Sequence, residues 1–288
     1  MTTVSAIVVN YRAYAELDAC LASLRHQPDP LEILVVDQES DAAEFGRLAR
    51  RHPGVCWLAQ PGNSGFAAGV NLAARQARGA YLYLVNPDSV VDAGTPRALS
   101  EWLAAHDHVG VAGSLVRDTD GGIQGSARRF PDLSTFIAGR SAWLTRRFPA
   151  NALSQRNVLT GVSVSDPTLV DWVSGASMMI RREAFEEARG FDARYFLYWE
   201  DADLCRRLKS LGWATAYVPG VGVTHHGARS SRGSARSIVA FHKSAFRYFL
   251  THTGVIGRIA SPLAALALAI RLGVKLLLRG PGRRQVAP

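Results

Sequence analysis

Short apolar segments alternate with amphipathic segments over the first 115 residues, and this order limits the possible folds more than any other feature. Segments with the length and composition of strands occupy residues 5–9, 31–36, 55–58, 80–85 and 109–115. Residues 14–24, 67–77 and 95–105 have helical character, and Asp41 is placed to cap a further helix. The alternation predicts an α/β fold with a mostly parallel sheet and helices on both of its faces.

The alternation fades over residues 118–165, where we expect long irregular loops. Order returns with a predicted strand at 169–180, helices at 182–188 and 200–211, and a strand at 214–218. Helices are predicted again at 237–250 and 263–278. We therefore expect one main domain, residues 1–235, followed by a basic helical region, residues 236–288.

The charge of the chain is unevenly distributed. The 288 residues carry a net charge of +9, and the part that follows Asp203 contains 14 Lys and Arg but no Asp or Glu. A basic block of this length indicates an anionic partner, such as pyrophosphate, a membrane surface or nucleic acid. Nucleic acid is the less favoured partner, because the aromatic residues gather around an acidic cluster that repels phosphate.

The last apolar run, residues 262–278, is shorter than the roughly 20 residues that a membrane span needs. Arg271 and Lys275 interrupt it. The pattern favours an amphipathic helix lying on a membrane surface, and a core-packing helix with a basic tail is the alternative. The three scattered cysteines and the lack of a secretory signal predict a cytoplasmic protein with reduced thiols.

Polar residues follow three of the predicted strands: Asn10, Asp37 and Asp88. In open α/β sheets, ligands bind outside the carboxyl ends of the strands, so we expect these side chains to converge. Asp37 is suited to accept hydrogen bonds from a base or ribose, with a helix cap as the alternative. Asp88, aided by Asn86, is suited to hold Mg²⁺ or Mn²⁺, although Asn-Pro-Asp is also a common turn.

A loop containing glycine, residues 61–71, leads into a predicted helix. Such a loop brings backbone N–H groups close to a phosphate or nucleoside, but a plain turn is almost as compatible with the pattern. The pair His225 and His226 follows a strand and precedes Arg229 and Arg232. An imidazole there can bind a cation or a pyrophosphate, or it can be structural.

Three carboxylates, Glu200, Asp201 and Asp203, lie within four residues at the start of a predicted helix and follow Tyr198 and Trp199. Acidic residues at this position also stabilise the helix dipole. Crowded acids beside aromatic surface have raised pKa values and can act as a general base, so we favour the catalytic interpretation.

Taken in order, these segments resemble the family 2 glycosyltransferases, and in particular their rhamnosyltransferase-like branch. The matching segments extend over about residues 4–250 and are 7–11, 35–37, 63–71, 85–88, 173–176, 191–192, 198–205 and 225–227. The resemblance implies a GT-A fold, which is Rossmann-like, and an inverting single displacement on a nucleotide-sugar.

The resemblance also implies roles for individual residues. Asp201 is expected to be the base, with Glu200 the less favoured holder of that role. The divalent cation, Mg²⁺ or Mn²⁺, is expected on Asp88 and on His225 or His226. The expected nucleotide-sugar contacts are Asn10, Tyr11, Asp37, Asn63, Gly65, Asn71, Asn86, Arg229 and Arg232. The expected acceptor-side residues are Trp172, Gly175, Tyr198 and Trp199, with the irregular segment 118–165 nearby.

By the same resemblance, the expected donor is dTDP-L-rhamnose, and UDP-galactofuranose or another UDP- or GDP-sugar is the alternative. The expected acceptor is a cell-surface polysaccharide or a saccharide linked to a polyprenyl diphosphate. We expect the basic C-terminal region to bind the cytoplasmic face of the inner membrane, since basic segments are attracted to anionic lipid. A non-catalytic binding protein with the same fold is a further, less favoured, alternative.

Overall fold

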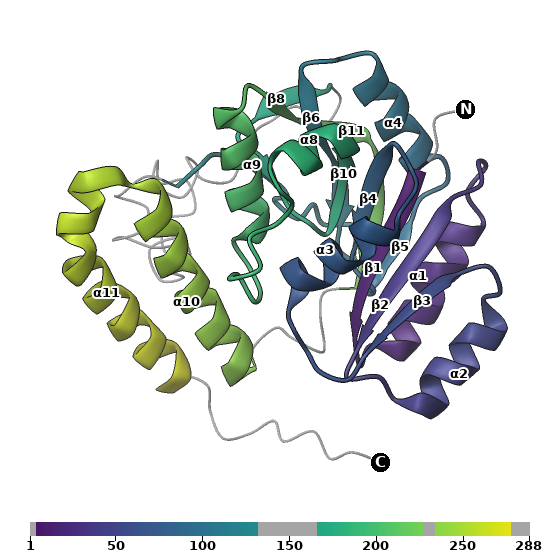
Figure 1. The fold of residues 1–288 in the computed structure, drawn as a ribbon, viewed down its shortest axis with the longest axis horizontal. Helices are drawn as coiled ribbons and strands as arrows, with labels where there is room; N and C mark the ends of the chain where they lie inside the picture. Colours follow the sequence, from purple (N-terminus) through teal and green to yellow (C-terminus); the bar gives the residue numbers. More distant parts are fainter. Residues whose placement is uncertain (1–3, 132–165, 227–233, 278–288) are drawn as a thin grey trace.

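The computed structural model describes residues 4–131, 166–226 and 234–277, in which nine strands form one large mixed sheet (Figure 1). The spatial order is β3-β2-β1-β4-β10-β6-β11-β5, with β8 paired to β11. The strands of this sheet are β1 (Val4–Tyr11), β2 (Glu32–Gln38), β3 (Cys56–Gln60), β4 (Tyr81–Val85), β5 (Ser89–Val91), β6 (Val109–Arg117), β8 (Thr168–Val170), β10 (Ser177–Arg181) and β11 (Ala214–His225).

Most strands of the sheet run in one direction, as predicted. The strands β3, β2, β1 and β4 are parallel neighbours, and β11 is parallel to β6. Strand β10 lies antiparallel between β4 and β6, and β5 and β8 run antiparallel to β11. The mixed half of the sheet therefore begins where β10 enters, next to the four-stranded parallel half.

The single strand predicted over residues 169–180 is wrong, because this stretch divides into β8, β9 (Trp172–Val173) and β10. Asp171 separates the first two, and its carboxylate accepts the Phe130 N–H and pairs with Lys209. Strand β9 leaves the main sheet and pairs with β7 (Ala127–Arg128). These two short strands bring the segment after β6 next to the 172–176 segment.

Helices cover both faces of the sheet, as predicted (Figure 1). One face is covered by α1 (Tyr14–Arg25), α2 (Ala42–Arg51) and α4 (Thr95–Ala104). The other face is covered by α3 (Phe66–Gln76), α8 (Arg182–Glu187) and α9 (Glu200–Ser210). Asp41 caps α2 as expected, since its side chain accepts the N–H groups of Ala43 and Glu44.

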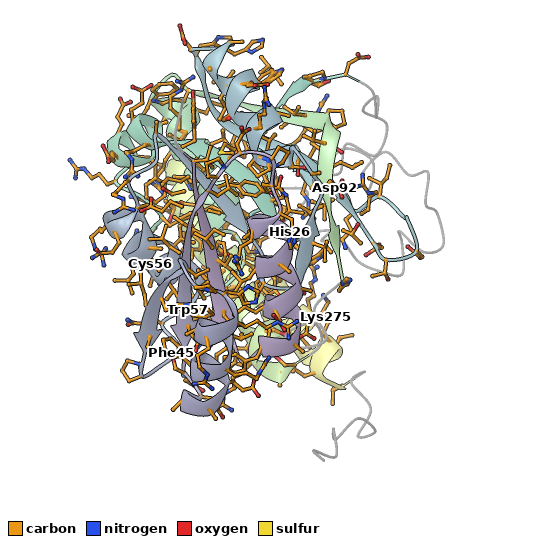
Figure 2. All side chains as sticks on the ribbon, turned by 90° about the vertical axis from the view of Figure 1, so that its right-hand side faces the viewer. His26, Phe45, Cys56, Trp57, Asp92 and Lys275 are labelled. Atoms are coloured by element: carbon orange, nitrogen blue, oxygen red, sulfur yellow. The ribbon has the colours of Figure 1, made fainter. Side chains whose placement is uncertain are left out.

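Alternate residues of each central strand supply the two apolar layers. In β1, Ala6 and Val8 face α1, whereas Ile7 faces the α3 side. At the outer strand β3, Trp57 packs edge to face against Phe45 of α2, with ring centroids 5.3 Å apart (Figure 2). The packing of these two apolar layers fixes the positions of the strand ends, and therefore also the positions of the residues that follow each strand.

A helical hairpin formed by α10 (Ala235–His252) and α11 (Gly254–Leu277) lies outside α9 (Figure 1). Two buried polar contacts hold it there: His252 Nε2 lies 2.8 Å from Asp203 Oδ1, and Ser244 donates to the Leu197 carbonyl. Helix α11 begins nine residues before the predicted start at residue 263. The helix was predicted to start after Pro262, but this proline lies inside it. The apolar run is thus longer than predicted: residues 257–277 are long and apolar enough to cross a membrane, by length and composition.

Candidate active site

A cleft of about 410 Å³ opens at the carboxyl ends of β1 and β4, where an open α/β sheet binds its ligands. Its polar end is formed by the ends of strands, and its apolar end by the α10–α11 hairpin. The residues predicted from the sequence that line it are Tyr11, Asn63, Gly65, Asn86, Asp88, Trp172, Gly175, Tyr198, Trp199, Glu200, Asp201 and His225.

Asp88 and His225 meet in this cleft although 137 positions separate them in the chain. Strand β5 pairs with the end of β11, which brings Asp88 Oδ1 within 3.0 Å of His225 Nε2. His226 contributes its backbone N–H to the Asp88 carbonyl, and its side chain is exposed. Of the two histidines, His225 is therefore the one placed beside the carboxylate.

The contacts of His225 test whether a cation fits. Nδ1 lies 3.2 Å from Gln124 Oε1, an oxygen that only accepts hydrogen bonds, and Nε2 lies 3.2 Å from Asn86 Nδ2, which only donates. With a cation bound, Nε2 would offer its lone pair beside the Asp88 carboxylate, and Nδ1 would donate its proton to Gln124 Oε1. Two neighbouring ligands of an octahedral Mg²⁺ lie about 3 Å apart, which matches the spacing of these two atoms.

The protein side of such a cation site is small. Among residues 4–131, 166–226 and 234–277, no group of three His, Cys, Asp or Glu side chains is placed to hold a metal ion. Asp88 and His225, with Asn86 beside them, fit a hard cation whose shell is completed by phosphate oxygens. This arrangement is suited to a cation that is shared with a diphosphate substrate.

Asn10 and Asp37 lie side by side as expected but do not line the cleft. Asn10 Nδ2 donates to Asp37 Oδ1 at 2.7 Å, and Tyr14 donates its hydroxyl to Asp37 Oδ2 at 3.2 Å. Both residues are completely buried, and Asn10 also accepts the Ala13 N–H. These contacts join β1, β2 and α1, and the direct contact of the two side chains with the nucleotide stays a prediction.

The next residue, Gln38, reaches the cleft instead. Its side-chain amide donates to the Gly65 carbonyl at 2.9 Å and accepts the Gly65 N–H at 3.2 Å, and Asn63 also accepts that N–H. Gly65 has a φ of +91°, and a Cβ there would lie 2.3 Å from the Phe196 carbonyl oxygen. The loop before α3 is thus held by side-chain contacts, and only glycine fits at position 65.

Asn71 does not line the cleft, and its contact with the nucleotide-sugar stays a prediction. Its amide donates to the Phe191 carbonyl at 2.8 Å and accepts the Phe191 N–H at 2.9 Å. The Asn71 side chain therefore joins α3 to the loop after α8, which leads to the acidic cluster. Arg229 and Arg232 lie outside the described residues.

Asp201 and Glu200 line the cleft in different environments. Asp201 Oδ1 accepts the Ala202 N–H at 2.8 Å, and Oδ2 accepts the Gly175 N–H at 3.2 Å. Glu200 is 5% exposed, and its Oε2 has no hydrogen-bond partner among the described residues. Asp201 is half-buried, so its carboxylate is held in place and open to a ligand.

The pKa values of the pair differ because of these environments. Burial, with the charge of Asp201 beside it, raises the pKa of Glu200 to about 8. Burial also raises the pKa of Asp201, but the N–H groups of Ala202 and Gly175 and the charge of Arg128 act in the opposite direction. The surroundings of Asp201 therefore favour its charged form more than those of Glu200 do.

The backbone before this pair adopts an uncommon conformation. Tyr198 and Trp199 have φ values of +69° and +72°, in the left-handed region that residues other than glycine rarely adopt. Trp199 also packs against Phe241 and Tyr248 of the hairpin, with ring centroids 5.7 and 5.2 Å away. Consecutive residues in this region are typical of functional sites, and here they direct Glu200 and Asp201 into the cleft.

Asp203 has a structural role. It is 1% exposed and accepts hydrogen bonds from Arg207 at 2.8 Å and from Tyr195 at 3.4 Å, in addition to its contact with His252. These contacts fix α9 against α10. Of the three carboxylates in the cluster, only Glu200 and Asp201 therefore face the cleft.

Trp172 and Gly175, which were predicted to lie on the acceptor side, line the same cleft. Other residues that line it were not predicted as site residues from the sequence. Arg128 lies over the Trp172 ring at 4.9 Å, and the Trp172 indole donates to the Arg129 carbonyl. Gln38, Arg128, Arg129, Gln124, Phe241, Leu268 and Arg271 also line the cleft. The sequence feature that could have pointed to some of these residues is the adjacent pair Arg128 and Arg129, which lies in the segment predicted to be irregular.

The chain is similar to known glycosyltransferases. The sequence profile described as Glycosyl transferase family 2 matches residues 5–189, and that of Glycosyl transferase family group 2 matches residues 134–277. An N-acetylglucosaminyl-diphospho-decaprenol L-rhamnosyltransferase of Mycobacterium tuberculosis is 32% identical over 99% of this chain and 98% of its own length. Rhamnosyltransferase WbbL of Escherichia coli K12 is 26% identical over 84% of this chain and 90% of its own.

Solved structures share the fold at low identity. The mannosyltransferase PcManGT from Pyrobaculum calidifontis, in complex with GDP-Man and Mn²⁺, has a TM-score of 0.59 at 18% identity, over 96% of this chain and 75% of that one. GalNAc-T7 with UDP, GalNAc and Mn²⁺ has a TM-score of 0.62 at 16% identity, over 85% of this chain and 47% of that one. These similarities confirm the predicted GT-A fold.

Proposed function

The chain belongs to glycosyl transferase family 2, and on that premise we propose that it transfers L-rhamnose from dTDP-L-rhamnose to a sugar linked to a polyprenyl diphosphate. The observation that carries the proposal is the similarity to the mycobacterial L-rhamnosyltransferase, which extends over 99% of this chain. The position of Asp88 and Asp201 in one cleft supports it, because a donor diphosphate and an acceptor hydroxyl have to meet there.

Asp201 acts as the general base. Its carboxylate accepts the proton of the acceptor hydroxyl as the oxygen attacks the anomeric carbon, while the nucleoside diphosphate leaves from the opposite face of the sugar. The N–H groups of Gly175 and Ala202 orient the carboxylate. Glu200 is suited less well, because a carboxyl group with a pKa of about 8 is mainly protonated at neutral pH.

The polar end of the cleft holds the donor. The loop that contains Asn63 and Gly65 contacts the nucleoside, and Tyr11 and Gln38 lie on the adjacent wall of the cleft. Asp88 and His225, with Asn86, would hold the divalent cation. Bound Mg²⁺ or Mn²⁺ supplies positive charge that stabilises the leaving diphosphate.

The enzyme associates with the cytoplasmic face of the inner membrane through α11. Seven apolar side chains of this helix are exposed and recur every three or four residues along one face: Val255, Ile259, Leu263, Leu266, Ile270, Val274 and Leu277. Arg258 is exposed on the same helix, and residues 236–288 contain no acid. An apolar face with basic residues and no acids is typical of a helix that lies in an anionic membrane surface.

The proposal is tested by incubating the purified full-length chain with Mn²⁺, an N-acetylglucosaminyl-diphospho-lipid and, in separate reactions, dTDP-L-rhamnose, UDP-galactofuranose or GDP-mannose. We expect a mass increase of one rhamnosyl unit with the first donor alone. Transfer from another donor would refute the rhamnose assignment, and absence of transfer from all three would refute the activity. Flotation with vesicles containing anionic lipid tests the membrane contact separately.

A further inference from the structure

Helix α11 has two faces of different character. The exposed apolar residues lie on one face, whereas Ala264 and Leu268 are 3% and 6% exposed and pack inward toward α10. Arg271 and Lys275 continue this inward row at helical spacing. Both side chains therefore extend from the side of α11 that faces α10; Arg271 is half-buried there, and Lys275 lies at the exposed end of the row.

Both cations converge on one aromatic ring of α10. The Arg271 guanidinium lies 5.9 Å from the centroid of Phe241, and Lys275 Nζ lies 5.7 Å from the same centroid. Burial lowers the pKa of the neighbouring residue His242, and the positive charges of Arg271 and Lys275 lower it further. Positive charge thus collects between the two helices of the hairpin.

Arg271 is also part of the cleft wall. It lines the same cleft as Asp201, together with Phe241, Leu268 and Trp199. One helix therefore presents apolar side chains to its surroundings on one face and a guanidinium to the catalytic cleft on the other. A lipid-linked acceptor needs this combination, because the far part of its apolar chain stays in the membrane while its head group and the adjoining part of the chain enter the cleft.

We propose that Arg271 binds the diphosphate group of the acceptor, while its lipid chain follows the apolar wall formed by Leu268 and Phe241. The inference rests on the proposed polyprenyl-diphosphate acceptor and assigns the residue that recognises it. A guanidinium donates two parallel hydrogen bonds to phosphate oxygens, which makes arginine the suitable side chain. Arg128, on the wall formed by β7 and β9, lies over Trp172 and influences Asp201, so it serves the reacting end of the cleft.

The test compares two soluble acceptors that carry the same N-acetylglucosamine. One is linked through a diphosphate to a short prenyl chain, and the other is an alkyl glycoside without phosphate. We expect Arg271→Gln to raise KM for the diphosphate acceptor about 10- to 100-fold and to leave KM for the glycoside and for the donor within about twofold. Arg258→Gln is the matched control, because it removes the same charge from an exposed position of α11.

The inference is overturned if Arg271→Gln affects both acceptors equally, if it affects neither, or if Arg258→Gln has the same selective effect. Arg271→Lys keeps the charge without the planar fork and should give a smaller, still selective, increase in KM, which guards against misfolding of the first variant. Binding of the diphosphate lipid without donor, followed by tryptophan fluorescence, separates this inference from the proposed activity. A wild-type enzyme that transfers no rhamnose still reports on Arg271 in that measurement.

Discussion

Replacing Glu200 by glutamine isolates the electrostatic cost of burying a carboxylate at the start of α9. The folded protein raises the pKa of this group from its ordinary value of 4.5 to about 8, because the side chain is buried and Asp201 lies beside it. A raised pKa means that the folded state binds the proton more tightly than the unfolded chain. The resulting stability is present below pH 4.5 and is lost as the pH rises toward 8.

The size of the effect follows from the two pKa values. Each pH unit between them changes the free energy of unfolding by about 1.4 kcal/mol, so the wild-type protein loses about 3 kcal/mol from this group between pH 5 and pH 8. Glutamine is neutral throughout and has nearly the same shape. The Glu200→Gln variant should therefore exceed the stability of the wild type by only about 1 kcal/mol at pH 5 and by about 4 kcal/mol at pH 8.

Urea denaturation followed by tryptophan fluorescence at pH 5, 6, 7 and 8 measures this difference. Glu186→Gln is the control, because that glutamate is 65% exposed and its variant should differ from the wild type by the same small amount at every pH. A difference between Glu200→Gln and the wild type that does not change with pH would refute the reasoning.

Three further outcomes are expected. Asp201→Asn should lower kcat by about 10²- to 10⁴-fold while calorimetry shows donor affinity within about twofold of the wild type, as expected for loss of a general base. Gly65→Ala should lower the free energy of unfolding by about 1–3 kcal/mol in urea titrations, because its φ is +91° and the added Cβ meets Phe196, whereas Gly62→Ala, which meets nothing within 4 Å, should change it by less than about 0.5 kcal/mol. Asp88→Asn should raise the Mn²⁺ concentration that gives half-maximal activity about tenfold or more in metal-depleted enzyme, and unchanged Mn²⁺ dependence would remove Asp88 from the cation site.

The sequence predicted most of the strands and the end of β4, because a buried strand that stops at a polar residue marks the edge of a parallel sheet. The predicted ends of β1 and β2 were two residues too early, and that of β11 was seven residues too early, since it continues to His225. The sequence did not predict which of two neighbouring residues lines the cleft. Asp37 and Gln38 are adjacent in β2, and their side chains point to opposite faces of the sheet. An error of one position in the prediction therefore exchanges a side chain in the interior for one at the cleft. The hydrogen bond from Tyr14 to Asp37 shows that Asp37 is the residue in the interior, and the sequence does not predict this contact.

Long-range contacts account for the other differences. Asn71 lies in the glycine-containing loop and helix segment, where a nucleotide contact was expected, but its partner Phe191 is 120 positions away. Arg271 was interpreted as an interruption of an apolar helix, and its place in the cleft depends on how the hairpin meets α9. Local periodicity contains no information about either contact.

The left-handed backbone at Tyr198 and Trp199 limits how this enzyme can diversify. Residues branched at Cβ are strongly disfavoured at such φ values, so random changes at these two positions will mostly be purged unless they introduce glycine, asparagine or aspartate. Evolution of a new acceptor preference, in nature or in a directed library, is therefore expected to proceed through the regular helix opposite, at positions such as Phe241 and Ala245. Those side chains border the same space from a regular helix, which does not restrict φ in this way, although the packing around Ala245, which is 1% exposed, limits the size of a new residue there.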